Sequence, residues 1–355
     1  MKGMTAKRFL VVVVSAIILF VLLLYAQKSA AKTDKLYIYN WTYYIPQSII
    51  QKFEKEFNVR VFYDEYSSNE EMFAKIQSGA KGYDLIFPSS DYVSIMINEK
   101  YLEKIDRGKL SNLENIDPFV LEKIFYDPNM EYSVPYYMGS ACVIVNTKKV
   151  PLFEKSWSIF SRGDLKNRIV MLDDMREVFG AALKSFGYSV NSIDENEIAK
   201  AADLIINNWK PNLTKFDSQA YGKGYASGDF WVVQGYAAPV YEEILNDQEL
   251  LNNTEFFIPY EGCPSYLDSM CILRGAKNIE NAYKFIDFIH RPQIYAEFCN
   301  TFMFPATVNI PARNFTGAHT LYTIDDLKNT EIKNDLGDKL PLYDDVWFNR
   351  IRVGK

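Results

Sequence analysis

The stretch Leu36-Tyr-Ile-Tyr-Asn-Trp-Thr-Tyr-Tyr44 decides the fold class of this chain. It begins as an alternation of aliphatic and aromatic residues, which is typical of a β-strand, and it ends in an aromatic cluster. Pro46 follows the cluster and opens a helical pattern that runs to Phe57. In open α/β sheets ligands bind where strands pass into helices, and the flat face of Trp41 suits an apolar or cationic ligand.

The alternation of strand and helix continues along the chain in two blocks. In the first block we expect strands at 36–40, 59–63 and 83–88 and helices at 46–57, 68–78 and 91–102. Ser68 and Glu71 have the spacing of a capping box that opens the helix at 68–78. In the second block we expect strands at 168–172, 213–216, 231–237, 255–259 and 268–273 and helices at 174–185, 195–209, 242–251 and 278–290. Such alternation predicts an α/β fold with parallel, doubly wound sheets, and two blocks predict two lobes with a ligand cleft between them.

Composition narrows the class of protein. The chain has 355 residues, 48% hydrophobic, which is ample for two domain cores, and its net charge of −6 argues against a general nucleic-acid role. Its histidines, His290 and His319, and its four cysteines lack the spacing of metal ligands, so we expect no metal site, no cofactor and no histidine-based catalysis. Both histidines are predicted at the surface or at a helix end. The cysteines are predicted to be free buried thiols, with a Cys263–Cys271 disulfide as the alternative.

The N-terminus has the pattern of an export segment. Basic residues precede an apolar run from Phe9 to Ala26, and Ser29-Ala30-Ala31 offers small residues for cleavage. We therefore expect residues 1–31 to be a cleaved signal peptide. The apolar run of 18 residues is just long enough to span a bilayer, so an uncleaved anchor is the alternative.

Three further groups of polar residues lie at predicted strand ends. Ser89 and Asp91 lie between a strand and a helix, where a carboxylate would make the mouth of the cleft acidic; ordinary helix capping is the competing interpretation. Asp174 and Glu177 share one helix face, although the same spacing is that of a capping box. Asp268 enters an apolar strand and so needs a hydrogen-bonding or charged partner, unless it is a turn residue.

Aromatic faces and carboxylates together suit an extended aliphatic amine. Its methylenes gain roughly 0.8 kcal/mol per CH₂ when buried against flat apolar walls. Its ammonium groups are stabilised by carboxylates and by ring faces. A sugar would instead need more amide groups, and an anion would need arginine, lysine or bare helix N-termini.

Several short motifs, in order and spacing, resemble the periplasmic spermidine/putrescine-binding proteins that feed polyamine ABC importers. The similarity runs from about Leu36 to the C-terminus. The matching stretches are Tyr39-Asn-Trp-Thr42, Tyr66-x-Ser-Asn-Glu-x-Met72, Tyr83-Asp-Leu85, Pro88-Ser89, Leu172-Asp-Asp-x-Arg-Glu-Val-Phe179, Leu267-Asp-Ser269, Arg291-Pro292 and Asn334-Asp335.

The resemblance implies ligand-binding roles for particular side chains. Asp174 and Glu177 would hold one ammonium end, Asp268 an inner amine, and Trp41 and Tyr44 would line the methylene chain. Thr42 and Ser89 complete the matching positions. The positions that depart from the family pattern and are also predicted at the site are Tyr43 for an acid, Asp91 for a tyrosine, Tyr266 for a tryptophan, Phe304 for a tyrosine and Lys333 for a glutamine.

These departures predict a rebuilt subsite for the far amine. Lys333 either points inward, where it would repel a cation and favour a shorter ligand, or it pairs with an acid of the cleft and is neutralised. The choice between putrescine and spermidine stays open.

The resemblance also implies a partner and an architecture, which is the two-lobed type II periplasmic-binding-protein fold with a mixed or parallel sheet flanked by helices in each lobe. Lobe 1 is expected at 35–137 plus 268–311 and lobe 2 at 138–267 plus 312–355, closing on the ligand by a hinge. The implied function is a periplasmic receptor, not an enzyme, that passes a polyamine to an ABC permease and meets the membrane only through its leader or that permease. The alternatives are a receptor of the same fold for iron, another cation or a small organic solute, a membrane-anchored polyamine sensor, and an enzyme using Asp174 and Glu177 as an acid–base pair.

Overall fold

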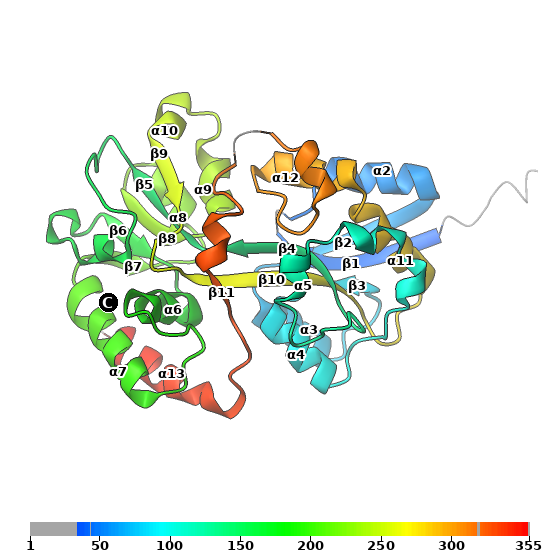
Figure 1. The fold of residues 1–355 in the computed structure, drawn as a ribbon, viewed down its shortest axis with the longest axis horizontal. Coiled ribbons are helices and arrows are strands. Elements are labelled where there is room, and N and C mark those ends of the chain that lie inside the picture. Colours follow the sequence, from blue (N-terminus) through cyan, green and yellow to red (C-terminus); the bar gives the residue numbers. More distant parts are fainter. Residues whose placement is uncertain (1–33, 43, 318–319, 354–355) are drawn as a thin grey trace, which may run out of the picture.

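Two mixed β-sheets with helices packed around them form the protein (Figure 1). The computed structural model describes residues 34–42, 44–317 and 320–353. The predicted export segment, Tyr43 and His319 lie outside the described residues. The two sheets lie in different halves of the molecule, and strands β4 and β10 run between the halves near its centre (Figure 1).

The first sheet carries the opening motif of the sequence. Its strands are β1 (Asp34–Trp41), β2 (Val59–Tyr66), β3 (Leu85–Ile86), β4 (Val134–Ser140), β10 (Pro264–Ile272) and β11 (Glu331–Ile332). The order is β11-β10-β3-β1-β2, with β4 also paired to β10. Strand β1 is parallel to β2 and β3, whereas β10 runs antiparallel to β3 and β4. Strand β10 therefore brings a late part of the chain beside the end of β3.

The second sheet has the order β7-β6-β8-β5-β9. Its strands are β5 (Cys142–Asn146), β6 (Ile169–Met171), β7 (Leu213–Phe216), β8 (Val232–Gly235) and β9 (Thr254–Phe257). Strand β6 is parallel to β7 and β8, and β5 is antiparallel to β8 and β9. The carboxyl ends of β6 and β8 thus lie on the same edge of this sheet.

Helices connect most of the strands. They are α2 (Gln47–Phe57), α3 (Asn69–Gln77), α4 (Ser90–Asn98), α5 (Pro118–Leu121), α6 (Met175–Ser185), α7 (Glu195–Leu204), α8 (Tyr221–Ala226), α9 (Ala237–Ile244), α10 (Gln248–Asn252), α11 (Ile279–Ile289), α12 (Pro292–Phe302) and α13 (Pro341–Val346). The predicted cap of α3 is confirmed, because Ser68 Oγ accepts from the backbone N–H of Glu71 at 3.1 Å. The Glu71 carboxylate accepts a hydrogen bond from the backbone N–H of Ser67, and not from that of Ser68 as in a full capping box.

Several predicted boundaries are wrong. The strand expected at 231–237 ends at Gly235. The single helix expected at 242–251 is two helices in the structure, α9, which ends at Ile244, and α10, which begins at Gln248. Helix α9 begins as early as Ala237, since Pro239 is tolerated in a first helical turn. No element was predicted for β4 and β5, whose residues are all buried and therefore lack the alternation of a half-exposed strand. Helix α12 was also missed, although Pro292 both ends the preceding pattern and occupies the first turn of this helix.

The cysteines and His290 lie in the interior. Cys142, Cys263, Cys271 and Cys299 are buried and free, which confirms the thiol prediction and excludes the Cys263–Cys271 disulfide. His290 lies at the C-terminal end of α11, which confirms the helix-end alternative over the surface one, and its side chain is fully buried. Burial lowers the pKa of His290 to about 4.

Candidate ligand-binding site

Asp268 is a buried acid of the candidate site. It lies inside β10, at an irregularity in the pairing with β4, and only 3% of it is exposed. The alternative that it is a turn residue is therefore wrong. Tyr44 Oη donates to Asp268 Oδ2 at 2.5 Å, and Ser89 Oγ donates to Asp268 Oδ1 at 2.5 Å. Ser89 reaches this carboxylate because it follows β3, which pairs with β10, and forms a backbone bridge to Asp268.

The Asp268 carboxyl titrates near neutrality. Burial raises its pKa to about 7, although the hydrogen bonds from Ser89 and Tyr44 act in the opposite direction. The negative charge of Asp91 raises the pKa further, whereas the ammonium of Lys333 lowers it. A cation placed against Asp268 would stabilise the ionised form in the same way.

The aromatic end of β1 is held firmly beside this acid. Trp41 is half-buried; its indole Nε1 donates to the carbonyl of Phe87 at 2.8 Å, and its ring lies 4.8 Å from that of Tyr66. Tyr66 Oη donates to the same carbonyl at 2.7 Å. Thr42 is exposed, and its hydroxyl donates to the carbonyl of Tyr66 at 3.3 Å. These bonds fix the orientation of the indole; the predicted role of Tyr43 lies outside the described residues.

Asp174 and Glu177 have different hydrogen-bond partners at the start of α6. Asp174 Oδ1 accepts from the backbone N–H of Glu177 at 3.0 Å, so the capping interpretation holds for this residue. The Glu177 carboxylate does not complete a capping box. It is fully buried, and its Oε1 accepts from Lys333 Nζ at 2.5 Å and from Tyr236 Oη at 3.3 Å. Its Oε2 is buried without a hydrogen-bond partner.

Lys333 therefore points inward and pairs with an acid, which was one of its two predicted arrangements. Burial alone would lower its pKa, but the negative charges of Glu177, Asp174 and Asp91 raise it above the ordinary value. Burial raises the pKa of Glu177 in spite of Lys333. Burial also raises the pKa of Asp91, against the opposing effect of Lys333 and Arg176. The lysine thus connects acids from both halves of the protein.

The first turn of α4 faces the same segment. Ser89 precedes α4 but makes no capping bond, because its hydroxyl is used on Asp268. Ser90 Oγ donates to the main-chain carbonyl of Lys333 at 3.1 Å. The interpretation of these two serines as ordinary helix caps is therefore wrong. The half-buried Asp91 follows them and adds the acidic character that was predicted.

Tyr266 and Phe304 differ in how far they are covered. Tyr266 is half-buried, and its ring lies 5.7 Å from Tyr236 and 6.4 Å from Tyr137. Phe304 is 6% exposed and stacks on Tyr137 at 4.8 Å with an interplanar angle of 20°. Phe304 thus belongs to the aromatic packing behind Tyr266, so it supports the wall of the site more than it forms its surface.

Two residues of this region were not among the predicted ligands. Tyr236 follows β8 and contacts Glu177, but the predicted strand ran on to Ala237 and so hid its strand-end position. Gln234 is fully buried; its Oε1 accepts from the backbone N–H of Leu172 at 2.9 Å and its Nε2 has no partner. Correct placement of the strand end would have identified Tyr236, since polar residues at strand ends signal a site.

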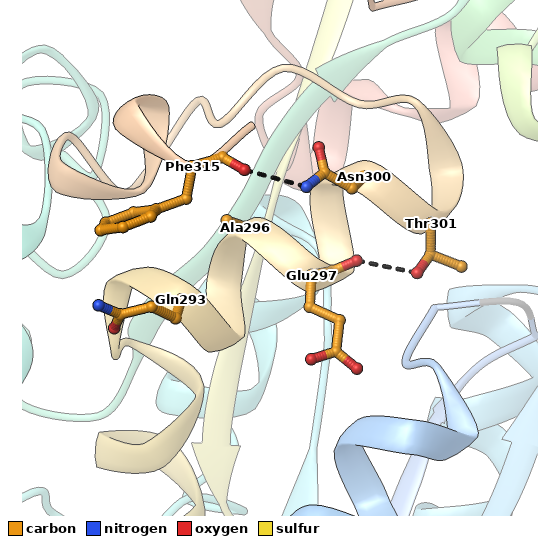
Figure 2. A pocket seen from close by; sticks show the side chains of 6 residues that line it. All are labelled: Gln293, Ala296, Glu297, Asn300, Thr301 and Phe315. Atoms are coloured by element: carbon orange, nitrogen blue, oxygen red, sulfur yellow. Dashed lines mark hydrogen bonds between the residues drawn. The ribbon is translucent and has the colours of Figure 1, made fainter. Parts of the chain in front are cut away.

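A surface depression of about 380 Å³ lies elsewhere, along α12 (Figure 2). Its lining residues are Gln293, Ala296, Glu297, Asn300, Thr301 and Phe315. Two side chains of the lining already donate hydrogen bonds to backbone carbonyls of the same lining, Asn300 to Phe315 and Thr301 to Glu297 (Figure 2). Glu297 is its carboxylate, and Lys52 and Ser48 already satisfy this group. None of the predicted ligand residues lines this depression.

Within residues 34–42, 44–317 and 320–353, no three or more His, Cys, Asp and Glu side chains group so that they could hold a metal ion. No helix within these ranges has both the length and the apolar character needed to cross a membrane.

Comparisons with known proteins agree with this geometry. A model of the bacterial extracellular solute-binding protein family matches residues 48–320. The chain is 35% identical over 339 residues to the spermidine/putrescine-binding periplasmic protein of Salmonella typhimurium, covering 92% of this chain and 94% of that protein. It is 36% identical over 274 residues to the putrescine/cadaverine-binding protein of Pseudomonas aeruginosa, covering 74% and 76%.

A solved structure extends the comparison to the fold. The Tp0655 (TpPotD) lipoprotein of Treponema pallidum is 49% identical, with a TM-score of 0.86 over 89% of this chain and 99% of that one. The predicted α/β fold class and the predicted resemblance are confirmed. The expectation of parallel sheets from the alternation of strands and helices is wrong for part of each sheet, because β10 runs antiparallel to β3 and β4, and β5 runs antiparallel to β8 and β9. The chain belongs to the bacterial extracellular solute-binding protein family.

Proposed function

We propose that this protein is a periplasmic receptor that binds a polyamine, putrescine or spermidine, between its two halves and delivers it to an ABC permease. It acts as a carrier and catalyses no reaction. The ligand roles of the predicted site residues, including the walls formed by Trp41 and Tyr266, are part of this proposal. So is the division into lobes at 35–137 plus 268–311 and 138–267 plus 312–355.

One observation carries the proposal: two buried carboxylates with different hydrogen-bond partners are both influenced by the charge of the same lysine. Asp268 lies between Tyr44 and Ser89, and Glu177 lies between Lys333 and Tyr236. Lys333 acts on the pKa of both acids. Buried carboxylates are costly unless a cation pairs with them. Lys333 pairs with one oxygen of Glu177 and leaves Oε2 without a partner, and Asp268 is hydrogen-bonded by two neutral hydroxyls, so the arrangement favours a ligand with more than one positive charge.

The names of the relatives support the same ligand class. The relatives from Salmonella typhimurium and Pseudomonas aeruginosa are named for spermidine, putrescine or cadaverine, all of which are aliphatic amines. The lobe division is supported by the pairing of β4 with β10, because both proposed crossings, 137/138 and 267/268, fall where Tyr137 pairs with Asp268 and Met138 with Leu267.

The direct test is calorimetric titration of the chain lacking residues 1–31, unfolded and refolded beforehand to remove any bound amine. We expect putrescine, spermidine or both to bind with micromolar or tighter affinity and to raise the melting temperature. Two matched controls should not bind: 1,4-butanediol, which keeps the carbon chain but lacks ammonium groups, and 4-aminobutyrate, which replaces one ammonium by a carboxylate. No binding of either amine would refute the proposal.

Binding is expected to depend on pH through Asp268. Its carboxyl has a pKa of about 7 in the free protein, so it is mostly protonated at pH 6 and must ionise when an ammonium group binds. We expect affinity to rise about tenfold between pH 6 and pH 8 and then to level off, with close to one proton released per ligand at pH 6. Calorimetry in buffers of different ionisation enthalpy measures that proton. An affinity that is flat across this range would contradict the assignment.

A further inference from the structure

We propose that Lys333 is a built-in ammonium group of the binding site, and that it makes a diamine with two charges a better ligand than a triamine with three. This inference rests on the proposed polyamine function and specifies the ligand within it.

The position of the lysine is fixed by the main chain around it. Lys333 follows β11, and its backbone N–H donates to the carbonyl of Ser265 on β10 at 3.1 Å. Its own carbonyl accepts from Ser90 Oγ at 3.1 Å. The side chain is only 12% exposed. Because both the N–H and the carbonyl of Lys333 are hydrogen-bonded, the fold itself fixes where the ammonium group lies.

Lys333 forms an ion pair with one of the two carboxylate oxygens of Glu177. Lys333 Nζ lies 2.5 Å from Glu177 Oε1, and the side chain of Glu177 has no exposed surface. Glu177 Oε2 is buried and has no partner. A ligand amine that bound Glu177 would lie close to the ammonium of Lys333, which already contacts the same carboxylate. Two positive charges so close together repel strongly in a buried site.

A count of charges indicates which ligand fits. Four carboxylates are coupled with one another through Lys333: Asp91, Asp174, Glu177 and Asp268. Two cations are among the main electrostatic influences on this set, Lys333 itself and Arg176.

With all four acids ionised, the set carries two net negative charges, which a diamine dication neutralises. Two neighbouring acids are left out of this count because one is already paired and the other is in water. Asp173 pairs with Arg352 at 2.8 Å, and Glu70, which also acts on Asp91, is exposed to solvent.

Replacing Lys333 by a neutral residue would change this balance by one charge. The site would then carry three net negative charges, and Glu177 would have both carboxylate oxygens free for a ligand amine. A triamine would fit that site better than a diamine. The inference therefore makes opposite predictions for the wild type and for Lys333→Gln.

The test is calorimetric titration of putrescine and spermidine into the wild type and Lys333→Gln. We expect the wild type to bind putrescine at least tenfold more tightly than spermidine, and we expect Lys333→Gln to shift that ratio at least tenfold towards spermidine. Two controls should keep the wild-type ratio. Lys333→Arg retains the charge, and Lys328→Gln removes an exposed lysine that pairs with Asp325 on the surface.

A second variant keeps the test decisive if Lys333→Gln does not fold. The double variant Glu177→Gln/Lys333→Gln removes the buried pair together and restores two net negative charges, so it should again prefer the diamine. A preference of this variant for spermidine, a wild type that prefers spermidine, or a ratio unchanged in Lys333→Gln would overturn the inference. If the wild type bound neither amine, the polyamine function would be overturned instead, and the inference with it.

Discussion

Asp268→Asn is expected to weaken polyamine binding by roughly thirtyfold or more, because truncating one partner of a buried, hydrogen-bonded charge pair costs about 2–5 kcal/mol. The substitution is nearly isosteric. The asparagine amide can still hydrogen-bond to Tyr44 and Ser89, since a hydroxyl both donates and accepts. The loss should therefore reflect the missing charge. Titration of putrescine and spermidine into both proteins measures it.

Stability measurements separate this effect from misfolding. In the free wild type, the pKa of Asp268 is raised from 3.8 in the unfolded chain to about 7, so the folded state binds the extra proton between these values. Its contribution to stability is full below pH 4 and is lost as pH rises through 7. Asp268→Asn lacks this decline, and we expect it to gain stability relative to the wild type as pH rises.

An exposed acid supplies the matched control. Asp338→Asn removes the same charge from the surface and should leave both affinity and its pH dependence unchanged. If Asp268→Asn bound polyamine as tightly as Asp338→Asn, Asp268 would not be a ligand residue.

Gly262→Ala is expected to lower the free energy of unfolding by about 4 kcal/mol, which corresponds to a melting temperature lower by roughly 10 °C. Gly262 has a φ of +88°, a conformation that side chains disfavour by about 1–2 kcal/mol. A Cβ atom there would also lie 2.1 Å from the backbone carbonyl oxygen of Asn329. That oxygen belongs to main chain and cannot rotate away, so the backbone must shift.

The same clash lies beside the segment that carries Lys333. The backbone N–H of Glu331 donates to the carbonyl of Cys263 at 3.1 Å, and Trp157 Nε1 donates to the carbonyl of Gly262 at 2.8 Å. Movement of either strand would break these bonds. The close approach of the segments around Gly262 and Asn329 therefore allows β11 to pair with β10, and this pairing places Lys333 in the site.

Gly187→Ala isolates the conformational part of this cost. Gly187 has a similar φ of +74°, but nothing lies within 4 Å of the position of its Cβ. We expect it to lose only about 1–2 kcal/mol. Thermal and denaturant unfolding of the two ligand-free variants compares them directly, and equal losses would show that the contact with Asn329 is unimportant.

Local patterns in the sequence determined most of the first block. Alternation in the opening stretch placed β1, Pro46 placed the start of α2, and Ser68 with Glu71 placed α3, because each signal acts between residues close in the chain. Strands buried on both faces, such as β4 and β5, lack a periodic signal, so their existence could not be read in the same way.

The residue types of the site were also readable, but their pairing was not. Asp174 and Glu177 have the spacing of a capping box, yet only Asp174 caps α6, while Glu177 turns towards a lysine 156 positions later in the chain. Asp268 is held by Tyr44 and Ser89, which lie 224 and 179 positions earlier. Spacing along the chain does not describe such contacts.

By itself, the sequence determined that carboxylates and aromatic rings lie at the ends of α/β strands, because strand and helix periodicity are local properties. Tertiary structure alone decided which charges meet. Strand β10 lies antiparallel to β3 and β4 and parallel to β11, and this crossing brings Asp268 to Ser89 and Lys333 to Glu177. Burial then decided their charge states, since removal from water changes a pKa only after the chain has folded around the group.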